Sequence, residues 1–388
     1  MHEQGVHTPT DFPAQALWCL VYQALENERC LDLRYRAIST DLMDDGPVPN
    51  YKVMKQLALR NRLGWLYRPF IALATTAMPV LAAVHWLTGL MVVVARVGRL
   101  SEATLHIIAT TPANMRLIKN AFGQEPELRM RHHDQDVLVL RRLSREIGIR
   151  GVLFCIAEHI RLLDQILRTK GRKRTDLLLH SRDAFLLLML ALYAKQRPTH
   201  CFATDDHYQR WAFVLSHSCA DLRLVQHGFL DPLVGFPNPF GNARTVYVRD
   251  QVFAPMYAAY YRICQSKVFS PTTVFAPNKF SRSGIFLASS FPSIDDEIDL
   301  VRLLKSRLEL PVIVKFHPSH AYDARQQTLA ALASLVSMDD HPECRLFVSH
   351  NSFMEFDYKV AGFPTFSIIR AGGVAATAQS IFGFLHQP

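Results

Sequence analysis

Residues 222–232, Leu222-Arg-Leu-Val-Gln-His-Gly-Phe-Leu-Asp-Pro232, contain the pattern that decides the fold. A short apolar run, Leu222 to Val225, predicts a buried strand that ends in Gln226-His227-Gly228. In open α/β proteins, ligands bind beyond the carboxyl ends of the strands. His227 places a titratable imidazole there, and Gly228 allows a substrate to approach the backbone closely. The structural alternative is a histidine that caps the strand end by bonding a loop carbonyl.

Apolar runs and helical patterns alternate along the chain after residue 103. We expect strands at 105–109, 200–204, 222–225, 284–288, 311–315, 345–348 and 364–369. We expect helices at 151–167, 183–195, 207–219, 295–308, 323–337 and 353–360, with a final helix closing the chain. Such alternation is typical of mostly parallel sheets.

The length of 388 residues favours more than one domain. A stretch rich in Pro and Gly, residues 232–242, predicts a boundary or a long loop. We therefore predict an α/β fold with two Rossmann-like, doubly wound domains that face a cleft. The expected divisions are a helical N-terminal region at 1–100, one domain at 101–240 and a second at 241–388.

The segment 69–95 contains no Asp, Glu, Lys or Arg across 27 residues. A helix of about 20 apolar residues crosses a bilayer core, and Trp65 beside basic residues is typical of an interfacial anchor. Pro79 lies inside the segment and both flanks are basic, which favours a re-entrant or interfacial hairpin bent near Pro79. A single spanning helix and a buried core helix are the alternatives.

The formal charge is +9, with basic residues concentrated in 52–68 and 161–174. Such patches bind nucleic acid, acidic lipid headgroups or phosphorylated substrates. No motif with aromatic interleaving is present, which argues against nucleic acid. The seven cysteines are scattered without a C-x-x-C spacing, which argues against a disulfide framework or a zinc site and favours a reducing compartment.

Two further strand ends carry polar motifs. Lys315-Phe-His317-Pro318 offers an imidazole in a rigid turn with a lysine nearby, and Ser349-His-Asn351-Ser352 opens a helix. Backbone N–H groups and serine hydroxyls at a helix start suit phosphate. Glu355 lies three residues after Ser352, so a capping box is an equally good structural explanation.

In their order and spacing, these motifs resemble bacterial surface and capsular polysaccharide glycosyltransferases of the GT-B fold. That group includes capsule Kdo transferases, bacterial polysialyltransferases and CDP-glycerol glycerophosphotransferases. The matching stretches are 205–228, 315–318 and 349–364, so the resemblance covers roughly residues 200–370. It implies an acceptor side in the domain at 101–240 and a nucleotide-donor side in the domain at 241–388.

The resemblance also implies roles for single residues. His227 is the expected general base on the acceptor hydroxyl. Asp205 or Asp206 is expected to orient His227 or the acceptor. The structural alternative is that these two residues only cap the following helix. The expected donor-binding residues are Gly228, Lys315, His317, Pro318, Ser349, Asn351, Ser352 and Glu355. Among them, His317 and the serines would bind phosphate and Glu355 the ribose. The motif Ser-His-Asn-Ser departs from the Ser-Ser or Ser-Thr that family members often carry, which leaves open which hydroxyl binds phosphate.

The expected function is transfer of a sugar from a nucleotide-sugar donor to a lipid-linked or surface polysaccharide acceptor. This would occur at the cytoplasmic face of the inner membrane, in capsule or lipopolysaccharide assembly of the bacterial cell envelope. Asp205-Asp206 lacks the Asp-x-Asp spacing of the metal-dependent GT-A transferases, so we expect no metal and no cofactor beyond a CMP-, CDP- or UDP-linked donor. The alternatives are a CDP-glycerol or ribitol-type phosphotransferase, a UDP-sugar 2-epimerase-like enzyme and an inactive membrane-associated scaffold.

Overall fold

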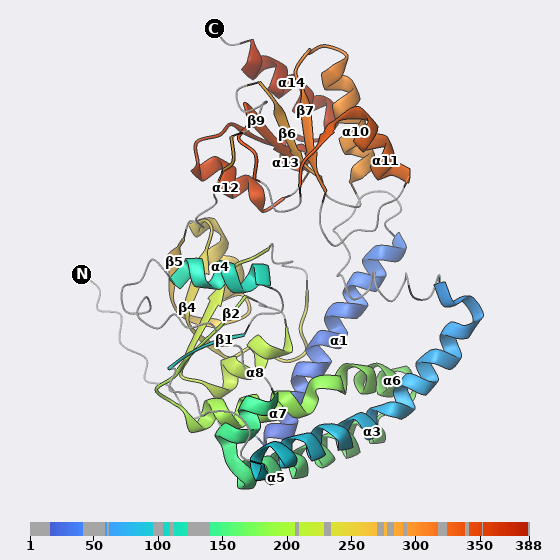
Figure 1. Ribbon diagram of the computed structural model, residues 1–388, viewed down its shortest axis with the longest axis vertical. Coiled ribbons are helices and arrows are strands. Elements are labelled where there is room, and N and C mark those ends of the chain that lie inside the picture. The colour runs from blue at the N-terminus through green and yellow to red at the C-terminus, as the bar shows by residue number, and fades with distance from the viewer. Residues whose placement is uncertain are drawn as a thin grey trace. The chain divides into compact units, whose positions relative to one another are not determined.

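The chain forms two compact α/β units in the computed structural model (Figure 1). The structure describes residues 16–41, 59, 62–95, 104–108, 112–122, 140–205, 209–228, 234–269, 275–277, 283–289, 293–316, 324–337, 341–350 and 352–386. The first unit comprises Met1–Ala37, Lys52–Gln226 and Leu230–Val268, and the second comprises Ile38–Tyr51, His227–Phe229 and Phe269–Pro388. Each unit is built on a five-stranded parallel sheet, which confirms the predicted α/β class.

The sheet of the first unit has the strand order β1-β2-β3-β4-β5. Its strands are β1 (Leu105–Ile108), β2 (Cys201–Thr204), β3 (Asp221–Val225), β4 (Asn242–Val248) and β5 (Arg262–Val268). The first three match the predicted strands. Residues 242–268, which we expected in the second domain, instead continue the first sheet, because β4 pairs with β3 and β5 pairs with β4.

Helices surround this sheet and form a separate layer at one end of the first unit. The helices and 3-10 turns are α1 (Leu17–Asp41), η1 (Gly64–Leu66), α3 (Tyr67–Val94), α4 (Pro112–Phe122), α5 (Leu140–Arg168), α6 (Gly171–His180), η2 (Ser181–Asp183), α7 (Ala184–Gln196), α8 (Arg210–Ser218), η3 (Gln251–Phe253) and α9 (Ala254–Ala258). Helix α7 is almost wholly buried, as predicted for residues 183–195. Within α5, Gly148 has a φ of 68°, a backbone conformation that favours glycine, and the helix is kinked there.

Helix α3 is one continuous 28-residue helix with Pro79 inside it, so the expected hairpin bend near Pro79 does not occur. The C-terminal half of the helix, which contains Trp86 and Gly89, is held in place by packing. A Cβ on Gly89 would lie 3.2 Å from the Ser144 hydroxyl and 3.5 Å from the Phe185 ring, so α3 approaches both α5 and α7 closely. The Trp86 indole N–H also donates to His159 Nδ1 on α5 at 2.9 Å. One face of α3 is therefore fixed to the first unit.

Polar contacts hold α1 against later parts of the first unit. Its side-chain contacts include Arg29–Asp176 at 3.2 Å, Asp32–His180 at 3.1 Å and Glu28–Arg210 at 3.3 Å. Asn27 also donates to the Asn238 carbonyl at 2.9 Å and accepts from its N–H at 3.0 Å. The part of the Pro- and Gly-rich stretch around Asn238 is thus docked on α1, inside the first unit.

The sheet of the second unit has the order β10-β9-β6-β7-β8, and all its strand pairs are parallel. Its elements are β6 (Ile285–Ala288), α10 (Ile294–Lys305), β7 (Val312–Lys315), α11 (Ala324–Leu332), β8 (Ser334–Leu335), β9 (Leu346–Ser349), α12 (Met354–Val360), β10 (Thr365–Ser367), α13 (Ile368–Ala371) and α14 (Val374–Leu385). The predicted helix 323–337 ends at Leu332, since its last residues form β8. The predicted strand 364–369 turns into α13 after Ser367.

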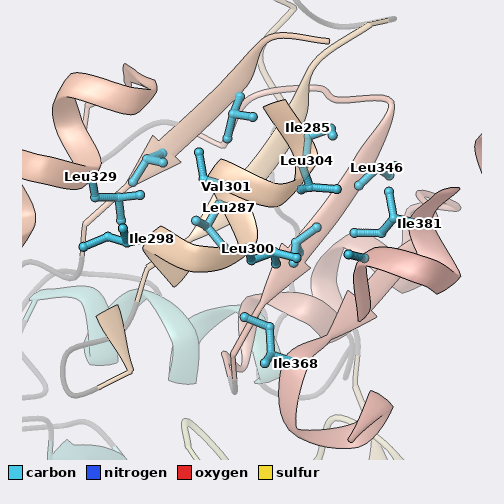
Figure 2. Close-up of a cluster of buried hydrophobic side chains, with 14 of the residues drawn as sticks. Ile285, Leu287, Ile298, Leu300, Val301, Leu304, Leu329, Leu346, Ile368 and Ile381 are labelled. Carbon is cyan, nitrogen blue, oxygen red and sulfur yellow. The ribbon is translucent and has the colours of Figure 1, made fainter. Parts of the chain in front are cut away.

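Figure 2 shows the main core of the second unit, which lies between the sheet and the helices α10, α11 and α14. Apolar side chains from alternate strand positions, such as Ile285 and Leu287 of β6, meet Val301 and Leu304 of α10. Burying one such side chain contributes about 1.5–3 kcal/mol to folding. Because the apolar residues are confined to the strand interiors, polar residues are left at the strand ends.

Two buried histidines couple the stability of the first unit to pH. His106 on β1 lies 2.8 Å from His200 Nδ1 and 3.3 Å from the Tyr193 hydroxyl. Burial, reinforced by the neighbouring His200, lowers the pKa of His106 from 6.5 to about 3. Burial, with a smaller contribution from His85, lowers the pKa of His159 from 6.5 to about 4. Both imidazoles are therefore neutral in the folded unit at pH 5.

We predict that the first unit loses stability as the pH falls below about 6.5. In the unfolded chain these histidines take up protons near pH 6.5, whereas the folded unit does so only near their lowered pKa values. The urea concentration at the midpoint of unfolding should fall between pH 7.5 and pH 5, and the substitution His106→Gln should make this fall smaller. Tryptophan fluorescence measures this unit, because Trp18, Trp65, Trp86 and Trp211 all lie in it. His386→Gln, at an exposed position, is the control, and equal pH dependence in both variants would contradict the assignment.

Candidate functional site

The predicted site residues fall into three groups. Asp206, His317, Pro318 and Asn351 lie outside the described residues. Asp205 belongs to the first unit, and His227 and Gly228 group with the second although they directly follow β3. Lys315, Ser349, Ser352 and Glu355 all belong to the second unit.

The end of β3 is held by its neighbour β4. The Gln226 backbone N–H donates to the Tyr247 carbonyl at 2.9 Å, and the Gln226 side-chain oxygen accepts from the Arg249 N–H at 3.0 Å. Gln226 is fully buried, whereas His227, the next residue, is exposed. A Cβ on Gly228 would meet no atom within 4 Å. The motif therefore presents an accessible imidazole on a firmly anchored strand end.

Asp205 directly follows β2 and is fully buried. The strands β2 and β3 pair in parallel, with Thr204 opposite Leu224, so both polar strand ends lie at the same edge of the first sheet. Because β4 also pairs in parallel with β3, Arg249 follows its strand at this edge as well. Sequence reasoning missed Arg249, since it did not find β4.

Four strands of the second unit end in one row. Lys315 of β7 pairs with Ala288 of β6, Ala288 pairs with Ser349 of β9, and Ser349 pairs with Ser367 of β10. The backbone N–H of Ser289 donates to the Lys315 carbonyl at 2.9 Å and extends this edge. The row thus gathers one ammonium group and three serine hydroxyls at the carboxyl ends of neighbouring strands. We refer to it as the strand-end row.

Hydrogen bonds fix the hydroxyls of the strand-end row. Ser289 donates to the buried carboxylate of Glu297 on α10. Ser349, which is fully buried, accepts from the Ser352 N–H at 3.2 Å, and Ser367 donates to the His350 carbonyl at 3.1 Å. These bonds tie the end of β6 to α10, fix the turn after β9 and join the end of β10 to the end of β9. The row is therefore a fixed arrangement of side chains and not a set of independent loop residues.

The predicted capping box between Ser352 and Glu355 is not formed. The Ser352 N–H is taken by Ser349, and the Ser352 hydroxyl accepts from the Met354 N–H at 3.3 Å. The nearly buried carboxylate of Glu355 instead forms an ion pair with Arg370 of α13. Helix α12 has only 7 residues, so its dipole is short, and the charge near this edge comes mainly from side chains.

A second ion pair crosses the same edge. His350 Nε2 lies 3.3 Å from the Asp296 carboxylate in the first turn of α10. This edge therefore carries the Lys315 ammonium group, the Arg370 guanidinium, the His350 imidazole and carboxylates from α10 and α12. Hydroxyls and cations bind phosphate, while carboxylates accept hydrogen bonds from sugar hydroxyls. The chemistry suits a ligand that has both parts.

The topology of the second sheet marks the same place. The chain leaves β6 to form β7 and β8 on one side, then returns to form β9 and β10 on the other. In open parallel sheets, ligands bind at the carboxyl edge where the strand order reverses in this way. The loops after β6 and β9 contain Ser289 and His350, so the strand-end row lies at the reversal.

Several residues of this edge were not predicted, namely Ser289, Asp296, Glu297, His350, Ser367 and Arg370. Ser289 could have been found, because it directly follows the predicted strand 284–288. Arg370 had no signal in the sequence, since its role depends on the turn from β10 into α13. Among the described residues, no group of three or more His, Cys, Asp or Glu is placed to hold a metal ion.

Comparisons with known proteins do not identify a relative. No protein-family model matches the chain, and no curated protein matches it. The chemistry of the strand-end row is therefore the main guide to the function of this chain.

We predict that Ser349→Ala destabilises the second unit by about 0.5–1.5 kcal/mol, the net contribution of the hydrogen bond that the Ser352 N–H loses. Hydrogen–deuterium exchange of a peptide covering β9 and α12 should become correspondingly faster. Ser306→Ala, at an exposed position after α10, should leave that exchange unchanged. Equal exchange in the two variants would show that the Ser349 hydroxyl does not support the turn.

Proposed function

We propose that the chain is a glycosyltransferase that uses a nucleotide-sugar donor, with the donor bound at the strand-end row of the second unit. The observation that carries this proposal is the row itself: Lys315 and three serines lie at the carboxyl edge of a parallel sheet, where the strand order reverses. The fixed hydroxyls and Lys315 suit the phosphates. Glu355 suits a ribose hydroxyl, in keeping with the resemblance of the motifs to GT-B enzymes.

In the proposed reaction, an acceptor hydroxyl oxygen attacks the anomeric carbon of the donor sugar. A new glycosidic bond forms, the bond from that carbon to the phosphate oxygen breaks, and the nucleotide leaves. His227 takes the proton of the acceptor hydroxyl, for which a neutral imidazole is well suited. Cationic and hydroxyl groups of the strand-end row stabilise the charge that develops on the leaving phosphate.

The acceptor in this proposal is a glycan or a lipid-linked glycan. The first unit supplies the acceptor side, where the end of β3 leads into the accessible His227 and the end of β2 into the buried Asp205. In this proposal the buried Asp205 orients His227 or the acceptor. A CDP-glycerol or ribitol-type transferase would use the same phosphate contacts, so the identity of the donor decides between the two activities.

We predict that the full chain binds at least one of CMP, CDP, UDP and GDP, detected by saturation-transfer NMR. Lys315→Met should weaken this binding tenfold or more, because a charge-assisted bond to phosphate is lost. Lys359→Met, at an exposed position on α12, is the matched control and should bind as the wild type does. Binding of none of the four nucleotides, or equal binding by both variants, would overturn the donor site.

We predict that His227→Ala lowers the transfer rate by about 10²–10⁴-fold, the usual contribution of a general base, and leaves nucleotide affinity unchanged. The measurement is sugar transfer from the nucleotide-sugar that carries the nucleotide found to bind, onto a glycan acceptor. His386→Ala is the control for loss of an exposed histidine. If His227→Ala turns over at the wild-type rate, His227 is not the base; if glycerol phosphate is transferred instead of a sugar, the phosphotransferase is the correct activity.

A further inference from the structure

Helix α3 exposes a long apolar face. Its most exposed apolar side chains follow a helical spacing along one side, with exposed fractions from 50% to 75%: Leu73, Val80, Val84, Leu87, Met91 and Val94. No charged residue interrupts this face, since residues 69–95 contain none. Isolated exposed apolar side chains are ordinary, but a contiguous face of this length marks a binding surface.

Helix α5 adds a second apolar stripe beside the first. Ile149, Leu153, Ile160 and Leu167 are 42–52% exposed and recur at helical spacing. Helix α3 packs along α5 in the first unit, running in the opposite direction, as the contacts of Gly89 with Val152 and of Trp86 with His159 show (Figure 1). We call these two stripes together the α3–α5 surface.

The opposite face of α3 is occupied by protein. Ala82, Gly89 and Val92 are buried, and Trp86 is bonded to His159. Within the part of the chain that the structure describes, two stretches, Gly64–Val94 and Gly171–Gln196, have the length and apolar composition to cross a membrane. The second is mostly buried and forms core. To span a bilayer, α3 would have to leave α5 and α7, whereas in this packing it can meet a membrane only along its side.

The charges around the α3–α5 surface are mostly of one sign. In the described residues 62–95 and 140–175, eight basic side chains are exposed: Arg62, Arg68, Arg150, Arg161, Arg168, Lys170, Arg172 and Arg174. The single exposed acidic residue in these ranges is Asp164, and it pairs with Arg168 at 2.7 Å. Helix α6 carries Arg172 and Arg174 in its first turn and packs against both α3 and α5. Trp65, 82% exposed, precedes α3.

We propose that the α3–α5 surface binds the surface of an anionic lipid bilayer, with α3 lying in the plane of the interface. Apolar side chains enter the boundary of the acyl chains, while arginines at the ends of α3 and α5 meet acidic headgroups. Trp65 suits the headgroup level, where aromatic rings collect. The basic border is what favours an anionic bilayer over a second copy of this chain, since two copies would bring like charges together.

The test is flotation of the full chain with vesicles of phosphatidylcholine, with and without 30% phosphatidylglycerol. We expect binding that requires the anionic lipid and weakens with salt. The double substitution Leu87→Glu and Met91→Glu should reduce partitioning at least tenfold. Arg172→Glu with Arg174→Glu should reduce it at low salt. Val252→Glu, on an exposed apolar residue of the first unit away from these helices, should change nothing. Unchanged tryptophan emission confirms that each variant is folded.

The depth of α3 separates an in-plane helix from a spanning one. Three variants each carry one introduced tryptophan, at Leu73, Val84 or Val94. A lipid brominated at one position of its acyl chain should quench the introduced tryptophan to the same extent in all three. A gradient with its deepest point at Val84 would overturn the in-plane arrangement. The binding itself is overturned if the wild type does not float with either vesicle, or if the glutamate double variant floats like Val252→Glu. The proposal is also overturned if sedimentation shows that the wild type is a dimer and that, among the variants, only the glutamate double variant is a monomer. The α3–α5 surface would then bind a second copy of the chain.

Discussion

Parallel pairing of every strand is the constraint on which the rest of this structure depends. A parallel strand must be followed by a long return connection, so the carboxyl ends of all strands in a sheet come to the same edge. The strands β2, β6, β7 and β9 are buried at every position, which leaves this edge as the place for polar side chains. Lys315, Ser349 and Ser367 are separated widely in sequence, yet strand pairing alone places them in one row.

This constraint explains how much of the fold could be predicted. Strands with continuous apolar runs, such as 284–288 and 311–315, were found together with the helices between them. Strands β4 and β5 were missed, because NARTVYV and RICQSKV mix polar and apolar residues and follow a Pro- and Gly-rich stretch that indicated a boundary. That stretch is instead docked on α1 through Asn27, a contact 211 residues apart that no local pattern reveals.

The site was predictable to the extent that it depends on strand ends. Lys315, Ser349 and Ser352 were chosen as candidates because each lies at or just after the end of a recognisable strand. The pairing of Glu355 with Arg370 was not predicted, because the spacing of Ser352 and Glu355 indicates a local helix cap. The actual partner of Glu355 comes from another element, α13. Likewise, the absence of charge in 69–95 predicted membrane association, but it did not predict how α3 packs. The packing of α3 depends on Gly89 and Trp86, whose contacts lie on α5 and α7.

The packing of α3 has a consequence for the order in which the chain is made. The helices that cover its inner face, α5 and α7, end at Arg168 and Gln196, and α3 ends at Val94, so the second of them is complete roughly 100 residues after α3. At a synthesis rate of about 5–20 residues per second, α3 waits on the order of 5–20 seconds before its partner helices exist. During that interval it is an uncharged helical segment with both faces exposed. Under the proposed lipid contact, α3 would be available to a bilayer during translation, before α5 and α7 hold its inner face against the first unit.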